Sequence, residues 1–331
     1  MMSGRNRELD ILKAFGIFLM VFDHVGWGDL VHTYIQSFHM PLFFIVSGYL
    51  WKPEQNIKKI AIRRFKTVLV PYFSFVILYL MIMIVASIAG LSDKNIVLAL
   101  RAVLLFPTDM QNMPFAPALW FLPCFFFCNL LYAFLSEKLG KNKWIAMMLL
   151  ATVGFIYSTM TNYMLPFSLE PLMVTPLFML VGEFIKENEE KIFHWLNKCW
   201  ILLGLTVLDG ILVYINGSCD LRSARYHNCG LYIVDAILGT LIIWGIIRKI
   251  LNVSIMNRVG LTYLSIYSIT FLCVNQIAIM LCEKAFACIM SNYSFIIKIF
   301  QKFITLIVAI IICIAMNECL SQSKLKFMVG K

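Results

Sequence analysis

The chain has 331 residues, of which 61% are hydrophobic and only 14% are charged, and its formal net charge is +10. A soluble domain is about half apolar, so this composition excludes an ordinary soluble protein and indicates a polytopic membrane protein. The N-terminal MMSGRNRELD is polar and mixed in charge, and no small-residue cleavage site follows the first apolar stretch. We therefore expect that stretch to be a retained helix and not a signal peptide.

Apolar runs near 20 residues are long enough to cross a bilayer as helices. The sequence predicts an all-α polytopic integral membrane protein with about ten transmembrane helices. We expect residues 1–331 to form a single integral membrane domain with no fused soluble domain. The ten apolar segments are 9–29, 38–51, 68–90, 119–136, 144–161, 171–186, 200–216, 230–250, 262–281 and 303–320.

Lysine and arginine accumulate in cytoplasmic loops. Assigning the N-terminus to the cytoplasm places 21 of the 28 Lys and Arg residues inside. This distribution predicts that both termini are cytoplasmic. The positive charge then follows from topology and requires no nucleic-acid partner.

Two predicted outer loops are long enough to be functional: residues 91–118, with Pro107, Pro114 and Pro117, and residues 217–229. The ten cysteines form no C-x-x-C pair and no Cys/His cluster, so we expect no metal site. Cys219 and Cys229 share the second loop, where an oxidising compartment would permit a disulfide.

The first apolar segment carries two ionisable residues, Lys13 and His24, eleven positions apart. Eleven helical steps overshoot three turns by only about 20° and rise about 16 Å, so both residues share one helix face. Ionisable groups at membrane depth usually mark a pathway or an active site. For Lys13, a snorkelling side chain at the helix end, paired with Asp10, is the alternative. His24 must find hydrogen-bond partners inside the membrane.

A second histidine, His39, begins the next apolar segment. An antiparallel hairpin brings it to the same level as His24, and two imidazoles form a plausible general-base site. An interfacial structural role for His39 is the alternative. Asp23 cannot face its neighbour His24 on a helix, so it needs a partner from another helix.

Four stretches in order, RNRELDILKAFGIFLMVFDH, FHMPLFFIVSGYL, RRFKTVLVPY and ALWFLPCFF, resemble the membrane acyltransferase family 3, particularly the branch similar to fucose 4-O-acetylases. The resemblance covers essentially the whole chain. It implies transfer of an acyl group, commonly acetyl from acetyl-CoA, to a hydroxyl of a cell-envelope sugar or polysaccharide precursor, free or lipid-linked. Acetyl-CoA would be a substrate and not a permanently bound cofactor. We expect the protein to sit among the lipids of the bacterial plasma (inner) membrane.

The resemblance also implies roles for individual residues. His24 would be the catalytic residue and Lys13 a contact to the donor. A basic R-x-x-R pair often opens the third helix of relatives, and here Arg63 and Lys66, beside Arg64, are the nearest match. We expect these three to bind the nucleotide end of acetyl-CoA, with ordinary positive-inside charge as the alternative. Many relatives have a histidine in a late helix, where this chain has Asn275 and Gln276.

Candidate acceptor contacts lie elsewhere. In the 217–229 loop, Asp220, Arg222, Arg225 and Asn228 suit sugar hydroxyls or a lipid diphosphate, and a solvated polar turn is the alternative. Trp120 is a candidate for stacking on a sugar ring or for a membrane-interface anchor.

No G-x-S-x-G motif or reactive-cysteine setting is present, which disfavours a serine or cysteine acyl-enzyme and leaves His24 as the best base. The alternative function is a transporter or flippase of a lipid-linked or envelope sugar. Paired discontinuous helices, which would favour transport, are not evident.

Overall fold

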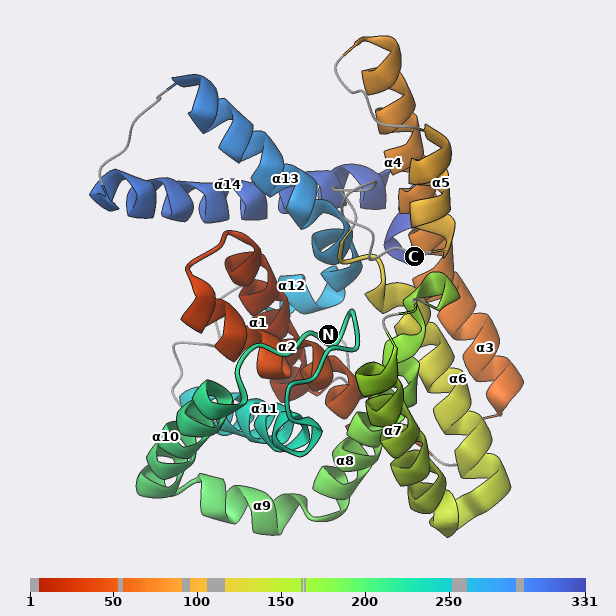
Figure 1. Ribbon diagram of the computed structural model, residues 1–331, viewed down its shortest axis with the longest axis vertical. Coiled ribbons are helices and arrows are strands. Elements are labelled where there is room, and N and C mark those ends of the chain that lie inside the picture. The colour runs from red at the N-terminus through yellow and green to blue at the C-terminus, as the bar shows by residue number, and fades with distance from the viewer. Residues whose placement is uncertain are drawn as a thin grey trace.

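The computed structural model describes residues 6–52, 56–90, 96–105, 117–161, 163, 165–251, 261–289 and 295–331. These residues form helices and connecting turns without a β-strand (Figure 1). A single isolated antiparallel bridge between Asp220 and Arg225 is the one extended pairing within them. The prediction of an all-α protein is confirmed.

The helices run in chain order as follows: α1 (Arg7–His24), α2 (Asp29–Tyr49), α3 (Ile57–Arg64), the π-helical turn η1 (Phe65–Leu69), α4 (Val70–Ile88), α5 (Ile96–Leu105), α6 (Phe121–Leu139), η2 (Gly140–Asn142), α7 (Lys143–Met160), η3 (Pro166–Ser168), η4 (Glu170–Met173), α8 (Thr175–Glu187), α9 (Glu189–Leu196), α10 (Cys199–Asn216), α11 (Cys229–Leu251), α12 (Leu261–Ile266), α13 (Ser268–Ile289), α14 (Phe295–Gln322) and η6 (Lys326–Val329).

Each of the ten apolar segments overlaps one of these helices. Six helical stretches within the described residues are long and apolar enough to cross a membrane: Ile57–Ile88, Phe121–Met160, Cys199–Asn216, Cys229–Ile250, Ser268–Cys288 and Phe295–Gln322. Several of these stretches expose large apolar side chains, as lipid contact requires. The chain is therefore an integral membrane protein. The count of about ten crossings and the cytoplasmic termini stay predictions.

The boundaries around the first turn differ from the prediction. Helix α1 ends at His24 and not at residue 29, because Gly26 and Gly28 adopt positive φ angles of 78° and 111°, which break a helix. Helix α2 already begins at Asp29, so residues 29–37 are helical and not a loop. His39 consequently lies ten positions into α2 instead of at its start. This part of α2 reads as a loop because it is polar.

Two other predicted loops contain helix. The basic stretch 52–66, which the sequence suggests is an inner loop, contains α3 and the first two residues of η1, and η1 continues into α4. The long loop 91–118 contains α5, and its residues 91–95 and 106–116, including Pro107 and Pro114, lie outside the described residues.

Helices α1 and α2 lie at the centre of the molecule, with α8 and α11 beside them (Figure 1). The closest approach joins α2 to α8 through two glycines. A Cβ added to Gly48 would lie 1.8 Å from the Met179 carbonyl oxygen, and one added to Gly182 would lie 1.9 Å from the Ile45 carbonyl oxygen. Only glycine permits such backbone contact. The crossing fixes the position of α2.

An ionic cluster joins α1, α2, α9 and α11. It lies at the ends of α1 and α2 that are opposite the turn containing Gly26 and Gly28. Arg248 of α11 contacts Glu8 of α1 at 3.2 Å and also pairs with Glu189 of α9. Trp244 donates to Glu8, and Tyr49 donates to Glu189 at 2.5 Å. Four helices are thus tied together by one guanidinium group and two carboxylates.

Candidate active site

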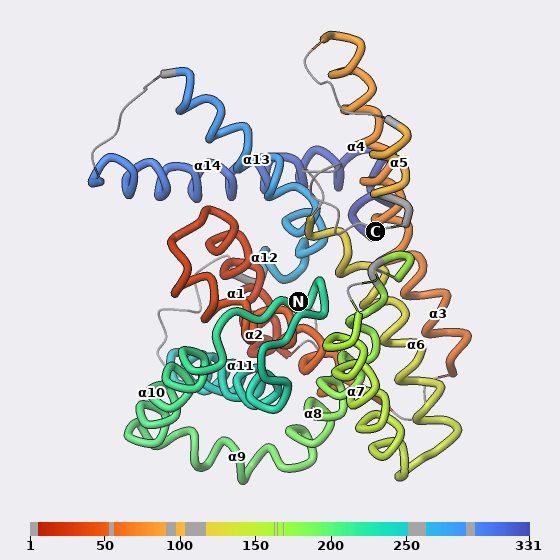
Figure 2. Tube along the Cα trace, viewed as in Figure 1, coloured from red at the N-terminus to blue at the C-terminus, as the bar shows by residue number. Residues whose placement is uncertain are grey.

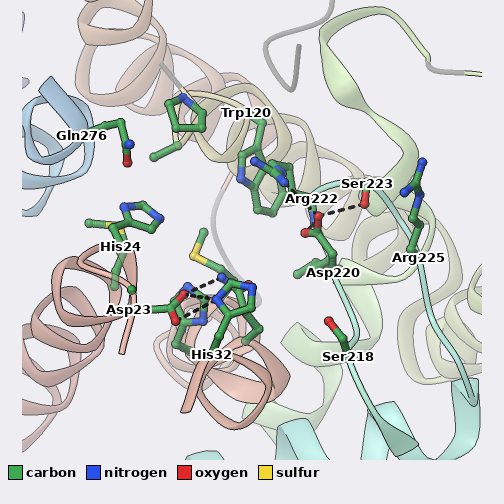
Figure 3. Close-up of a pocket in the computed structure, with 18 residues that line it drawn as sticks. Asp23, His24, His32, Trp120, Ser218, Asp220, Arg222, Ser223, Arg225 and Gln276 are labelled. Carbon is green, nitrogen blue, oxygen red and sulfur yellow. Dashed lines mark hydrogen bonds and ion pairs between the residues drawn. The ribbon is translucent and has the colours of Figure 1, made fainter. Parts of the chain in front are cut away.

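A half-open cavity of about 580 Å³ lies beside the turn between α1 and α2. Its walls come from the end of α1, from α2, from residues 117–120, from the α10–α11 loop and from α13. Figure 3 shows His24 and Gln276 on one side of the cavity, the loop residues on the opposite side, and Asp23 with His32 between them.

The cavity brings together most of the residues predicted to act on substrate. Those that line it are His24, His39, Trp120, Asp220, Arg222 and Arg225. Asn228 does not line it, and neither do the predicted donor contacts Lys13, Arg63, Arg64 and Lys66. The candidate catalytic and acceptor residues are therefore one cluster, and the candidate donor residues are separate from it.

His24 is the last residue of α1, and its ring has a defined hydrogen-bond partner. Its Nδ1 atom lies 2.6 Å from Oδ1 of the buried Asn275 in α13. The Asn275 amide nitrogen donates to the carbonyl oxygens of Phe271 and Leu272, at 2.8 and 2.9 Å. A carbonyl oxygen only accepts, so these two bonds fix the amide with its oxygen toward His24. His24 must then carry its proton on Nδ1, which leaves Nε2 as an acceptor.

His39 has the same arrangement through a different partner. Its buried ring lies with Nδ1 2.8 Å from the backbone carbonyl oxygen of Ile35. Since that carbonyl accepts, Nδ1 donates and Nε2 carries the lone pair. Both predicted histidines therefore present a basic Nε2 atom.

Asp23 has a hydrogen-bond partner on another helix, as expected from the sequence. His32 of α2 places Nδ1 at 2.9 and 3.1 Å from the two carboxylate oxygens, and Gln36 donates to one of them at 2.8 Å. His32 lies before the apolar segment of α2, and its side chain is 51% exposed. The hydrogen bond and the charge of Asp23 raise the pKa of His32 above its ordinary value, although partial burial opposes the shift.

Sequence reasoning missed His32 and Gln36. Both precede the second apolar segment, in a stretch read as a loop. Read as helix, His32, Gln36 and His39 have the spacing i, i+4 and i+7, which places all three on one face. That pattern was the signal available in the sequence.

The α10–α11 loop is an ordered turn and not a freely solvated one. Asp220 and Arg225 exchange two backbone hydrogen bonds of 2.9 Å. The Asp220 carboxylate accepts from the Arg222 guanidinium group at 3.1 Å and from the Ser223 hydroxyl at 2.9 Å. The loop reaches across toward α7 (Figure 2). Its Tyr226 ring packs edge-on against Phe155 of α7. This anchoring holds the guanidinium group of Arg222 at the cavity.

Other residues at the base of this loop have structural contacts. Asn228 accepts from the backbone N–H of Leu231 in the first turn of α11 at 3.0 Å, and its own N–H donates to Asn216. Cys219 and Cys229 are free thiols. Trp120 is buried at the cavity wall, with its ring edge-on to Phe121.

The candidate donor residues differ in their surroundings. Lys13 pairs with Asp10 at 3.0 Å, one turn away. Arg64 donates to Asn129 at 3.1 Å and lies over the Phe125 ring at 5.0 Å, so it packs against α6. Arg63 and Lys66 are exposed.

Comparison with known proteins gives one match. The family model described as an acyltransferase domain, that of acyltransferase family 3, matches residues 6–318. No curated protein and no solved structure matches the chain. The matched range contains the whole cavity and nearly all of the described helices. The chain therefore belongs to acyltransferase family 3.

Proposed function

We propose that the protein is a membrane O-acyltransferase that moves acetyl from acetyl-CoA to a hydroxyl of a cell-envelope sugar or polysaccharide precursor in the bacterial plasma membrane. The observation that carries the proposal is His24, whose Nε2 lone pair is fixed at the cavity by Asn275. Family membership supports acyl transfer as the reaction class. The donor, the acceptor and the residue roles below are parts of this proposal.

The chemistry requires a base for the acceptor hydroxyl. His24 Nε2 takes the hydroxyl proton while the oxygen attacks the thioester carbonyl carbon, and the tetrahedral intermediate then expels the thiolate. The same imidazolium returns its proton to the sulfur, which yields the ester and free CoA. His39, with its own basic Nε2, is positioned to hold a second hydroxyl of the acceptor.

The acceptor occupies the cavity in this proposal. Its volume of about 580 Å³ lies in the range of small-molecule sites. Asp220, Arg222 and Arg225 supply carboxylate and guanidinium groups for sugar hydroxyls or a diphosphate. Trp120 supplies an apolar wall for a sugar ring.

The donor approaches from the other end of α1. Lys13 lies eleven residues, or about 16 Å, from His24 along the helix, and a pantetheine arm spans that distance. The exposed Arg63 and Lys66 are the better candidates for the phosphates. Arg64 is less available because its guanidinium group is engaged with Asn129 and Phe125.

The test uses purified protein in lipid nanodiscs with labelled acetyl-CoA and an envelope glycolipid extract. We expect label in the glycolipid fraction and its loss in His24→Ala. His194→Ala is the matched control, because His194 lies in α9 away from the cavity and its removal should leave transfer intact. Full transfer by His24→Ala would refute the assignment of the base. No consumption of acetyl-CoA by the wild-type protein would refute acyl transfer and favour a transporter.

The acceptor is identified by mass spectrometry of envelope glycans from cells with and without the protein. We expect the loss of one acetyl group per modified unit in cells that lack it. An unchanged glycan profile would contradict a cell-envelope acceptor.

A further inference from the structure

The cavity contains a third histidine that the reaction described above does not use. We propose that His32 is a second catalytic group of this site, an imidazolium whose Nε2–H donates to the oxyanion of the tetrahedral intermediate. The inference rests on the proposed function and adds to it the residue that stabilises the developing negative charge. His32 and His24 line the same cavity (Figure 3).

The partners of the three cavity histidines divide them into two kinds. His24 donates to a side-chain amide oxygen and His39 to a backbone carbonyl oxygen, both of which are neutral. His32 alone donates to a carboxylate, that of Asp23. A neutral acceptor leaves an imidazole uncharged and basic, whereas a carboxylate favours the imidazolium form. The site thus has two neutral bases, His24 and His39, and one acid, His32, and each has its own hydrogen-bond acceptor.

Asp23 itself supports the charged form of His32. Its side chain is only 1% exposed, and a carboxylate buried without a cation is costly. Gln36 donates one hydrogen bond to it, but the amide is neutral. His32 is therefore the group that balances this buried charge.

The charged and titratable groups around His32 come from three elements. Asp23 and His24 lie on α1, His39 lies on α2 itself, and Asp220 and Arg222 lie on the α10–α11 loop. Asp220 favours the cation and Arg222 disfavours it, while Asp23 has the largest effect. The raised pKa of His32 agrees with the geometry.

The role of His32 follows from which of its atoms are occupied. Nδ1 is held between the two Asp23 oxygens, so the free donor of the imidazolium is Nε2–H. When the acceptor oxygen bonds to the thioester carbon, the carbonyl π electrons move to oxygen, and this N–H stabilises the resulting charge. The electron pair of the oxyanion then re-forms the carbonyl π bond as the C–S bond breaks, and the leaving thiolate takes its proton from His24. His32 ends the cycle in its starting state.

Kinetics in the nanodisc assay test the proposal. Removing one oxyanion donor lowers kcat about 10²-fold or more, so we expect that loss in His32→Gln with little change in KM. We also expect the alkaline limb of the wild-type pH profile to reflect loss of the His32 proton. Asp23→Asn should move this limb to lower pH. Asp209→Asn, which alters a buried carboxylate of α10 outside the cavity, should leave the limb in place.

A measurement independent of activity completes the test. ¹⁵N-histidine NMR of the full-length protein should show His32, assigned with His32→Gln, protonated to higher pH than in Asp23→Asn. Wild-type kcat in His32→Gln, or a His32 ring that is neutral throughout the active pH range, would overturn this inference. Either result can occur while His24→Ala is inactive, so failure of the His32 role is distinguishable from failure of the proposed function.

Discussion

The glycine contact between α2 and α8 makes the sharpest prediction about stability. In Gly48→Ala the new Cβ would lie 1.8 Å from the Met179 carbonyl oxygen, although ordinary contact begins at 3.4 Å. The obstacle is backbone, which cannot rotate away, so the helices must separate by roughly 1.5 Å or bend. Overpacking in a tight core costs about 1–3 kcal/mol, and a backbone obstacle places this variant at the upper end.

The assay is thermal unfolding of the detergent-solubilised protein, followed by loss of the monodisperse peak in size-exclusion chromatography. At about 2–4 °C per kcal/mol, a cost near 3 kcal/mol lowers Tm by roughly 6–12 °C. In Gly182→Ala the new Cβ would lie 1.9 Å from the Ile45 carbonyl oxygen, so we expect Tm to fall by a similar amount.

Gly204→Ala is the matched control. It also places alanine in a helix, but nothing lies within 4 Å of its added Cβ. Replacing glycine with alanine in a helix is worth up to about 1 kcal/mol, so the control should be unchanged or slightly more stable. Equal Tm values for Gly48→Ala and Gly204→Ala would refute the backbone contact.

Three further predictions follow from named contacts. Asn275→Leu removes the acceptor that fixes the His24 ring, so kcat should fall about 10–100-fold with KM nearly constant. A raised KM with an unchanged kcat would contradict this. Arg248→Gln leaves two partly exposed carboxylates without their cation, and we expect Tm to fall by about 2–4 °C, or about 1 kcal/mol. The His32 cation stabilises the fold fully below its ordinary pKa of about 6.5, and this stabilisation is lost as pH rises through the raised value. The Tm advantage of wild type over His32→Gln should therefore narrow above neutral pH, and a constant difference from pH 5.5 to 9 would refute it.

The apolar helices could be located from the sequence. Both the lipid-facing side and the buried side of such a helix are apolar, so the helix appears as a long uninterrupted run of hydrophobic residues. The helix prediction from hydropathy failed where a helix is polar. Residues 29–37 look like a loop because they are largely polar, and two of them, His32 and Gln36, line the cavity. The basic stretch 52–66 looks like a charged linker because of its lysines and arginines, although residues 57–66 are helical and continue through η1 into α4.

Some residues of the candidate site could be recognised from the sequence, and the contacts between them could not. His24 is recognisable because an imidazole at the end of an apolar run is unusual. Its partner was noticed only as a departure from the family pattern, since nothing local connects an amide in α13 with a ring in α1. The pairing of Asp23 with His32 needed the correct start of α2, which hydropathy alone does not reveal.

The bond between His24 and Asn275 spans 251 residues of sequence. Helix α1 therefore contains a histidine whose orienting group is synthesised 251 residues later. Until α13 has inserted and packed against α1, the ring has no fixed tautomer and the cavity has no wall on that side. A chain arrested before α13 would thus contain His24 without the group that orients its ring. In the proposed function, acyl transfer is then confined to molecules in which α13 has packed against α1.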